Sequence, residues 1–309
     1  MTRWLLGVLA LFLASAPSFG AHAVTPGALN GTIIAFGERR AIVGIEAHHA
    51  QFRLKIPNAD FQKSLVAARL GDSIAVVVDN AAKPGAITAM TSLTRPVAPM
   101  TVLWVMFCSA ALIAGLSAAF LWRRNPVVGV DNRYSNSQTQ LALWFVTVGA
   151  AYVATNILRA FVLDGDFIGG VELTGNVVAL TGLSAFTFGA AKVVASQKAD
   201  GQTLGAAPIT LPPGATQATP VSPVKTIADK ARLTDLVRDD KGNADLGDLQ
   251  MIFVTLAAVI IFLCQSFWWL SALQIAAQVV SPDVDTALLA TFGIGQGAYL
   301  FKKAATPNG

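Results

Sequence analysis

The sequence predicts a multi-domain membrane protein, in which a small exported all-β domain precedes an α-helical transmembrane bundle of five spans. Hydrophobic residues make up 54% of the 309 residues and charged residues only 13%, whereas charged residues form about a quarter of an ordinary soluble chain. The apolar residues are also gathered into long runs that alternate with segments of water-facing composition. This distribution argues against a cytosolic enzyme, and a net charge of only +4 argues against a nucleic-acid binder.

Residues 1–23 have the pattern of a secretory signal peptide. Arg3 supplies the positive start, residues 4–14 form a short apolar run, and Ala21-His22-Ala23 is a small-residue cleavage site. The run is shorter than the roughly 20 apolar residues that a spanning helix needs. We therefore expect cleavage after Ala23, with an uncleaved N-terminal anchor as the alternative.

Residues 24–96 are expected to form a small exported barrel. Five short runs rich in Ile, Val and Phe alternate with turn residues, and a helical segment beginning near Asn58 separates the third run from the fourth. This order is that of an OB-type barrel, and the domain resembles the small OB-type barrels that bacteria export. The predicted strands are Gly31–Phe36, Ala41–Glu46, Gln51–Ile56, Ser73–Val78 and Ala86–Met90.

The predicted barrel lacks the pattern of a nucleic-acid or metal site. OB folds that bind oligonucleotides use exposed aromatic side chains interleaved with basic ones, whereas the three phenylalanines of this domain stand at core positions. His48-His49 is the one pair that a metal could use. Some periplasmic copper-carrying barrels resemble this outline, but they add Met and Trp ligands, and the domain offers only Met90. We interpret the histidine pair as a polar hairpin and expect no metal, cofactor or nucleic acid.

Five apolar stretches follow the exported domain, and their flanking charges predict their orientation. Basic residues collect after the first, third and fifth stretches, whereas residues 163–175 and 278–285 contain five acidic residues and no Lys or Arg. Basic residues favour the cytoplasmic side of a membrane. We therefore expect a bacterial inner-membrane protein with a periplasmic N-terminal domain and a cytoplasmic C-terminus. The expected spans are Val97–Trp122, Gln140–Val162, Asn176–Ala195, Gln250–Ala276 and Thr286–Phe301.

Two transmembrane hairpins, at 140–195 and 250–303, are predicted to be parallel repeats. Trp144-Phe-Val-Thr147 aligns with Ile252-Phe-Val-Thr255 at an offset of 108 residues, and each unit goes out, turns through an acidic loop and returns. Parallel repeats weaken the expectation of an inverted-repeat transporter. Residues 196–249 between the hairpins read as a Pro/Ala/Gly-rich cytoplasmic linker with a short amphipathic helix.

Residues 133–144 and 289–303 resemble a family of bacterial inner-membrane proteins with tandem two-helix hairpins. The resemblance covers about half of the chain. It implies a membrane location and the hairpin topology, and it implies no activity.

Four polar residues at the starts of the outgoing spans are interpreted as helix caps. Ser137 and Gln140 have the spacing of a capping box. Asp245 and Asp248 stand at the corresponding positions of the second repeat, where an acid favours the positive helix end. The alternative for Gln140 and Asp248 is a substrate-binding role.

The last span contains the sharpest local motif, Gly293-Ile-Gly-Gln-Gly297. Gly293 and Gly297 form a GxxxG face, which favours close helix packing. The alternative is a pore lining that exposes glycine backbone and the side chain of Gln296 to ions.

Arg159 is a charged residue near the outer end of the second span, and such a residue is a functional hypothesis until its partner is named. Asp164 and Asp166 are close enough in sequence to form an ion pair with it. Ion binding is the alternative. The acidic outer loops could attract cations to a pore mouth, and they equally reflect the exclusion of basic residues from that side.

The sequence predicts a non-enzymatic protein. The mature chain has only His48 and His49 as histidines, and no P-loop, dinucleotide fingerprint or zinc-ligand spacing is present. We expect periplasmic binding or sensing, or a role as an envelope assembly subunit, with the lipid bilayer and a protein partner or second copy as partners. The alternative is a channel or transport component with a cation pathway through Gln296.

Overall fold

A computed structural model describes residues 27–37, 40–80, 83–120, 127–128, 132–165, 167–204, 230–238 and 245–305. The predicted signal peptide, Asp166 and most of the predicted linker lie outside these residues. The chain divides into two compact units. The first combines the N-terminal sheet with residues 150–172 and 263–282, and the second contains residues 111–149, 173–262 and 283–309.

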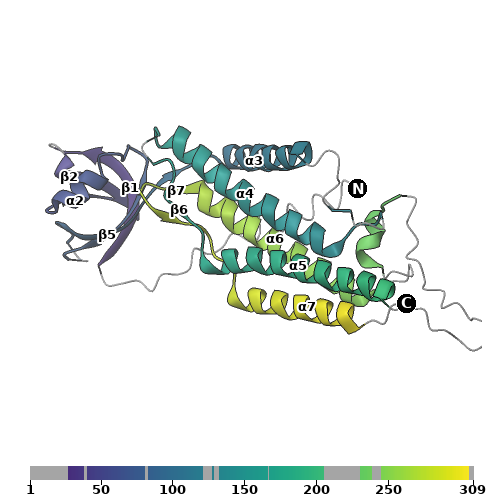
Figure 1. The fold of residues 1–309 in the computed structure, drawn as a ribbon. Coiled ribbons are helices and arrows are strands. Elements are labelled where there is room, and N and C mark those ends of the chain that lie inside the picture. The colour runs from purple at the N-terminus through teal and green to yellow at the C-terminus, as the bar shows by residue number, and fades with distance from the viewer. Residues whose placement is uncertain are drawn as a thin grey trace, which may run out of the picture. The chain divides into compact units, whose positions relative to one another are not determined.

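Five N-terminal strands and the later strand β7 form an open antiparallel sheet in the order β3-β2-β1-β4-β5-β7 (Figure 1). The short helix α2 (Ala59–Ser64) separates β3 from β4, and the side chain of Asn58 caps it by accepting from the N–H of Asp60 at 2.8 Å. The strands are β1 (Ala28–Phe36), β2 (Ile42–Ala47), β3 (Ala50–Lys55), β4 (Ser73–Val78), β5 (Ile87–Pro96) and β7 (Ala272–Gln274).

The prediction of a closed OB-type barrel is wrong. Closure would require a ladder between β3 and β5, but among the described residues one isolated bridge, between Lys55 and Ala86 just before β5, joins these edges. The last three residues of β5 pair with β7, where Thr94 faces Gln274 and Pro96 faces Ala272. The sheet is therefore open, and it ends in a strand from much later in the chain.

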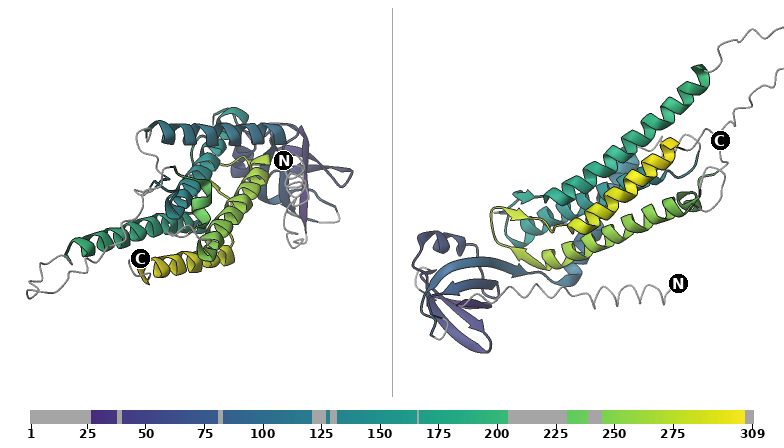
Figure 2. Two further views of the ribbon diagram at one scale, coloured as in Figure 1. Left: turned by 90° about the vertical axis from the view of Figure 1, so that its right-hand side faces the viewer. Right: turned by 90° about the horizontal axis from the view of Figure 1, so that it is seen from below.

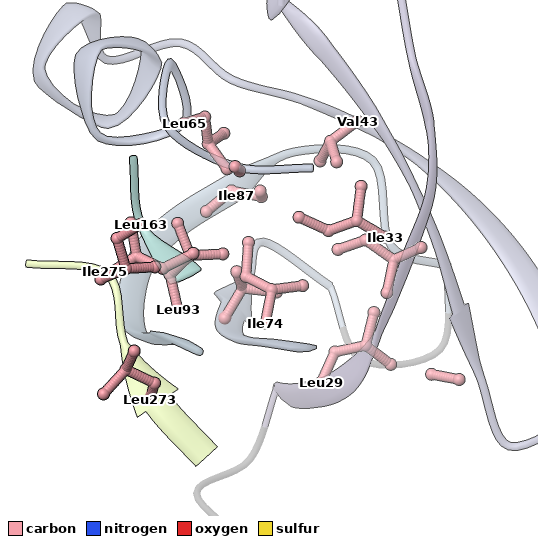
Figure 3. Close-up of a cluster of buried hydrophobic side chains, with 14 of the residues drawn as sticks. Leu29, Ile33, Val43, Leu65, Ile74, Ile87, Leu93, Leu163, Leu273 and Ile275 are labelled. Carbon is pink, nitrogen blue, oxygen red and sulfur yellow. The ribbon is translucent and has the colours of Figure 1, made fainter. Parts of the chain in front are cut away.

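The core of the first unit extends from the sheet into the ends of the helices. Inward side chains of β1, β4 and β5, such as Ile33, Ile74 and Leu93, meet Leu163 and Ile275, which follow α4 and α6 (Figure 3). Burial of such side chains is the main favourable term in folding. The sheet and these helix ends therefore share one hydrophobic core.

Five long helices follow the sheet, but the prediction of five membrane spans is wrong. Among the described residues, three helices are long and apolar enough to cross a membrane: 99–119, 136–162 and 246–271. The apolar part of α5, Gly175–Ala190, is shorter. The helices are α3 (Pro99–Phe120), α4 (Asn136–Val162), α5 (Gly175–Leu204), α6 (Leu246–Ser271) and α7 (Thr286–Ala305).

The loops after α4 and α6 pair with each other through two short parallel strands, β6 (Val171–Glu172) and β8 (Val279–Val280). Each paired residue is 108 positions from its partner, which is the offset of the predicted repeat. In the second unit α5 and α7 lie side by side along much of their length (Figures 1 and 2). The repeat itself stays a prediction.

His48 and His49 form a two-residue turn between β2 and β3, and both have a left-handed backbone, with φ of 50° and 64°. Positive φ at both central residues defines the type I′ hairpin turn, which matches the twist of the strands. Among the described residues no group of three or more His, Cys, Asp or Glu could hold a metal ion.

Replacing His48 by Asn and His49 by Gly is expected to stabilise the protein, because Asn-Gly prefers the type I′ turn and left-handed backbone costs other residues about 1 kcal/mol. Thermal unfolding of the full chain in detergent, followed by circular dichroism, should show a higher midpoint than for the wild type. The control, His48→Ala with His49→Ala, should show no increase. A midpoint that falls in the Asn-Gly variant, or that rises when zinc or copper is added to the wild type, would contradict the interpretation.

Candidate functional site

One buried guanidinium, that of Arg95 on β5, joins three segments of the first unit. It forms a bidentate ion pair with Asp72, in which Nε donates to Oδ1 at 2.9 Å and Nη2 donates to Oδ2 at 3.0 Å. Nη2 also donates to the carbonyl of Ala67 at 2.8 Å, and Nη1 donates to that of Val162 at 2.7 Å. Arg95 therefore connects the sheet, the loop 65–72 and the end of α4.

Each nitrogen of the Arg95 guanidinium and each carboxylate oxygen of Asp72 has a hydrogen-bond partner. Asp72 follows Gly71, whose φ of +91° turns the chain, and its Oδ2 also accepts from the backbone N–H of Arg69 at 2.7 Å. Both side chains are almost completely buried. A buried ion pair offsets its desolvation cost only when its geometry and remaining hydrogen bonds are good, and both conditions hold here.

Sequence reasoning missed Arg95, which stood at the end of the predicted domain. A usable signal was present, because Leu93 and Arg95 of β5 and Val97 directly after it stand at alternate positions, and all three are buried. Side chains two apart on a strand share a face. A charged residue between two core positions on one face indicates a buried cation with a specific partner.

A second ion pair joins the same loop to the residues that follow α4. The Arg69 guanidinium pairs with the carboxylate of Asp164, and both side chains are exposed. Exposed ion pairs stabilise a protein by at most about 1 kcal/mol. This pair therefore adds a positional contact at the junction and little stability.

Arg159 is fully buried, and its described hydrogen-bond partners are backbone carbonyls. Its Nε donates to the carbonyl of Phe167 at 2.6 Å, and its Nη2 donates to the carbonyls of Ala276 and Ala277 at 2.8 and 3.2 Å. Asp164 pairs with Arg69 instead, and Asp166 lies outside the described residues. The guanidinium thus holds the loops after α4 and α6 together through their carbonyl groups.

The second unit contains a buried polar cluster, which we call the glutamine cluster: Gln140 of α4, Thr255 of α6 and Gln296 of α7. Gln140 Nε2 donates to Thr255 Oγ1 at 2.8 Å and to the Met251 carbonyl at 3.2 Å, and its Oε1 accepts from Gln296 Nε2 at 2.6 Å. All three side chains are buried. Gln296 Oε1 has no partner among the described residues.

In the glutamine cluster, the side chains of Gln140 and Gln296 bond to residues of other helices and not to their own helix. The carboxamide of Gln140 bonds to α6 and α7 rather than to backbone at the start of its own helix. One turn further along α4, the ring of Trp144 packs edge-to-face on Phe262 and Phe292, with centroids 6.3 and 6.4 Å apart. Polar and aromatic contacts together fix these three helices against one another.

The other predicted caps lie at the helix starts. Asp245 precedes α6, and its Oδ1 accepts from the N–H groups of Gly247 and Asp248 at 2.9 and 3.4 Å. Ser137 is buried in the first turn of α4. Asn136 beside it donates to the backbone carbonyl of Asp248 at 3.3 Å, so the beginnings of α4 and α6 are joined directly.

α7 packs along α5, but the described residues leave room for a Cβ at both glycines of the GxxxG motif. A Cβ on Gly297 would meet nothing within 4 Å, and one on Gly293 would meet only Leu183 at an ordinary 3.7 Å. At Gly149 of α4, a Cβ would lie 2.8 Å from the Cδ1 atom at the flexible end of the Ile113 side chain.

Asp79 closes the connection between β4 and β5. Its Oδ1 accepts from the backbone N–H groups of Gly85 and Ala86 at 2.9 and 3.0 Å. These hydrogen bonds favour the ionised form and lower the pKa of the Asp79 carboxyl below its usual value. The carboxylate serves as an acceptor within its own loop.

A comparison with protein-family models finds no match, and neither does a comparison with curated proteins or with solved structures.

Replacing Arg95 by Ala is expected to lower the free energy of unfolding by about 3–5 kcal/mol, because it leaves the Asp72 carboxylate buried without its partner. Thermal unfolding in detergent would measure the loss. The double variant Arg95→Met with Asp72→Leu should lose less than Arg95→Ala. Arg69→Ala, at the exposed pair, is the control. If it destabilises the protein as much as Arg95→Ala does, the junction does not depend on the buried pair.

Gln296→Leu and Gln140→Leu are each expected to cost about 1 kcal/mol, because either change leaves a buried amide group unpaired. The double variant should lose less than the sum of the two single losses, which a double-mutant cycle in detergent would measure. Thr291→Val is a matched control on α7, since the Thr291 hydroxyl donates only to its own helix, at Ala287. Additive losses at Gln140 and Gln296 would show that the two side chains are not coupled.

Proposed function

We propose that this protein is a non-enzymatic subunit of the bacterial inner membrane, whose sheet domain lies in the periplasm and binds or assembles with another envelope component. The observation that supports this proposal is the Arg95 junction. It joins the sheet to the end of α4, while β7 joins the same sheet to the end of α6.

A domain held in this way differs from one on a flexible tether. A Gly- or Ser-rich linker lets a domain sample many orientations and serves only to localise it. Here β5 ends at Pro96 and α3 begins at Pro99, so the chain passes from strand to helix almost at once. In addition, the Val97 N–H donates to the carbonyl of Ser271, at the end of α6, at 2.9 Å. A partner that bound the sheet would meet it in one orientation, which favours assembly or signalling over simple anchoring.

The non-enzymatic part of the proposal is supported by how the buried polar groups are used. Arg95 and Asp72 satisfy each other, and Arg159 is held by backbone carbonyls. Groups that carry out acid–base or nucleophilic chemistry instead lie within reach of a substrate, with their pKa values matched to the task. The strongest polar contacts of this chain thus serve attachment.

A channel or transport component is the second candidate, and one observation favours it. Gln296 Oε1 is buried and unpartnered within the described chain, as an oxygen that binds a cation or water would be. Against it, the same side chain is held by Gln140 and packed in the protein interior. An aqueous pathway requires side chains that face water.

Two measurements test these candidates together. Purified protein in sealed liposomes should pass no cations. In native membranes, a photo-cross-linking amino acid in place of Gln51, which is exposed on β3, should give one discrete protein adduct. The same probe in place of Phe107, which is exposed on α3, should give lipid adducts.

The opposite pattern would overturn the proposal. Cation flux through the wild type that is lost in Gln296→Leu, with no adduct from Gln51, would make the channel the better function. Adducts with many unrelated proteins at Gln51 would count against a specific assembly role.

A further inference from the structure

Two apolar side chains of the sheet domain are exposed to an unusual degree. Val66 is 66% exposed and Leu70 is 64% exposed, and no other large hydrophobic residue in the described part of residues 27–98 is exposed to a comparable degree. Their neighbours Leu65 and Ala68 point into the core. The loop between α2 and β4 therefore turns two apolar side chains inward and two outward.

The Arg95 junction places this loop at the outer end of α4. One guanidinium binds the carbonyls of both Ala67 and Val162, at 2.8 and 2.7 Å, so these two backbone positions lie within a few ångströms of each other. The pairing of Arg69 with Asp164 makes a second link between the same segments. Val66 adjoins Ala67 in the chain, and Leu70 adjoins Arg69.

The end of α4 also carries exposed apolar side chains. Phe161 is 82% exposed and lies next to Val162, and Ile168 is exposed in the loop that follows. Because α4 is one of the three helices long and apolar enough to span a bilayer, its last turn lies near the hydrocarbon boundary when it does so. Apolar and amphipathic side chains are favoured at that level.

We propose that Val66 and Leu70 insert into the headgroup–acyl boundary of the bilayer that α4 spans, so that the sheet domain rests on the membrane surface. Arg69 and Asp164, exposed beside them, lie at the level of the lipid headgroups, where a long basic side chain extends its charge toward water. The domain is then held by its buried junction and by lipid contact at the same edge. This inference rests on the membrane location within the proposed function.

Site-specific fluorescence in reconstituted vesicles tests the insertion. Single cysteines are introduced by Val66→Cys or Leu70→Cys in a background with Cys108→Ala and Cys264→Ala, and each is labelled with the environment-sensitive dye NBD. The protein is reconstituted into phosphatidylethanolamine–phosphatidylglycerol vesicles that contain lipid with a nitroxide near the headgroup. Phe107→Cys on α3 reports membrane insertion itself. Gln51→Cys lies on β3, the opposite edge of the sheet from β7, and is the water-exposed control.

Labels at 66 and 70 should show blue-shifted emission and at least about twofold stronger nitroxide quenching than the label at 51, as expected for side chains in the interface. Quenching at 107 without quenching at 66 or 70 would overturn this inference and leave the membrane location intact. No quenching at 107 would overturn the membrane location itself. A blue shift at 66 and 70 that nitroxide lipid does not affect would indicate burial against protein, which also overturns the inference.

Discussion

The buried pairing of Arg95 with Asp72 is the interaction on which the first unit depends. Taking both charges out of water is costly, and they are tolerated because the guanidinium also binds two backbone carbonyls and the carboxylate also accepts from a backbone N–H. Removing either charge alone would leave the other one buried without its partner, which is strongly destabilising. The loop 65–72, the end of β5 and the end of α4 are therefore fixed as a set, and the edge where β7 joins the sheet lies on the same strand.

Much of the sheet was predictable from the sequence, because the alternation of apolar and polar residues is a local signal. The sixth strand was not. Ala272, Leu273 and Gln274 continue the apolar run of α6, and nothing within the run indicates that the helix ends at Ser271. These residues form a strand because β5 offers an unpaired edge, and that edge is a property of the folded sheet.

The candidate site shows the same division between local and distant signals. The role of Asp245 follows from its position before an apolar run. The bond between Gln140 and Gln296 joins residues 156 positions apart, and Gln140 has the spacing of a capping box, so the local pattern pointed elsewhere. For Arg159 the sequence offered nearby carboxylates, whereas the structure uses the carbonyls of Ala276 and Ala277. Backbone acceptors have no sequence signature, and only the fold brings them together.

The late origin of β7 also has a consequence for biosynthesis. Gln274 is 180 residues after Thr94, the residue that it faces, so the first five strands leave the ribosome long before the sixth. Throughout that interval the outer edge of β5 presents unpaired N–H and C=O groups, which invite pairing with other chains. Its completion requires α6 to have been synthesised and positioned first. The sheet thus reaches its final form only after most of the helical part has been made, which links the maturation of the domain to the synthesis of the helices.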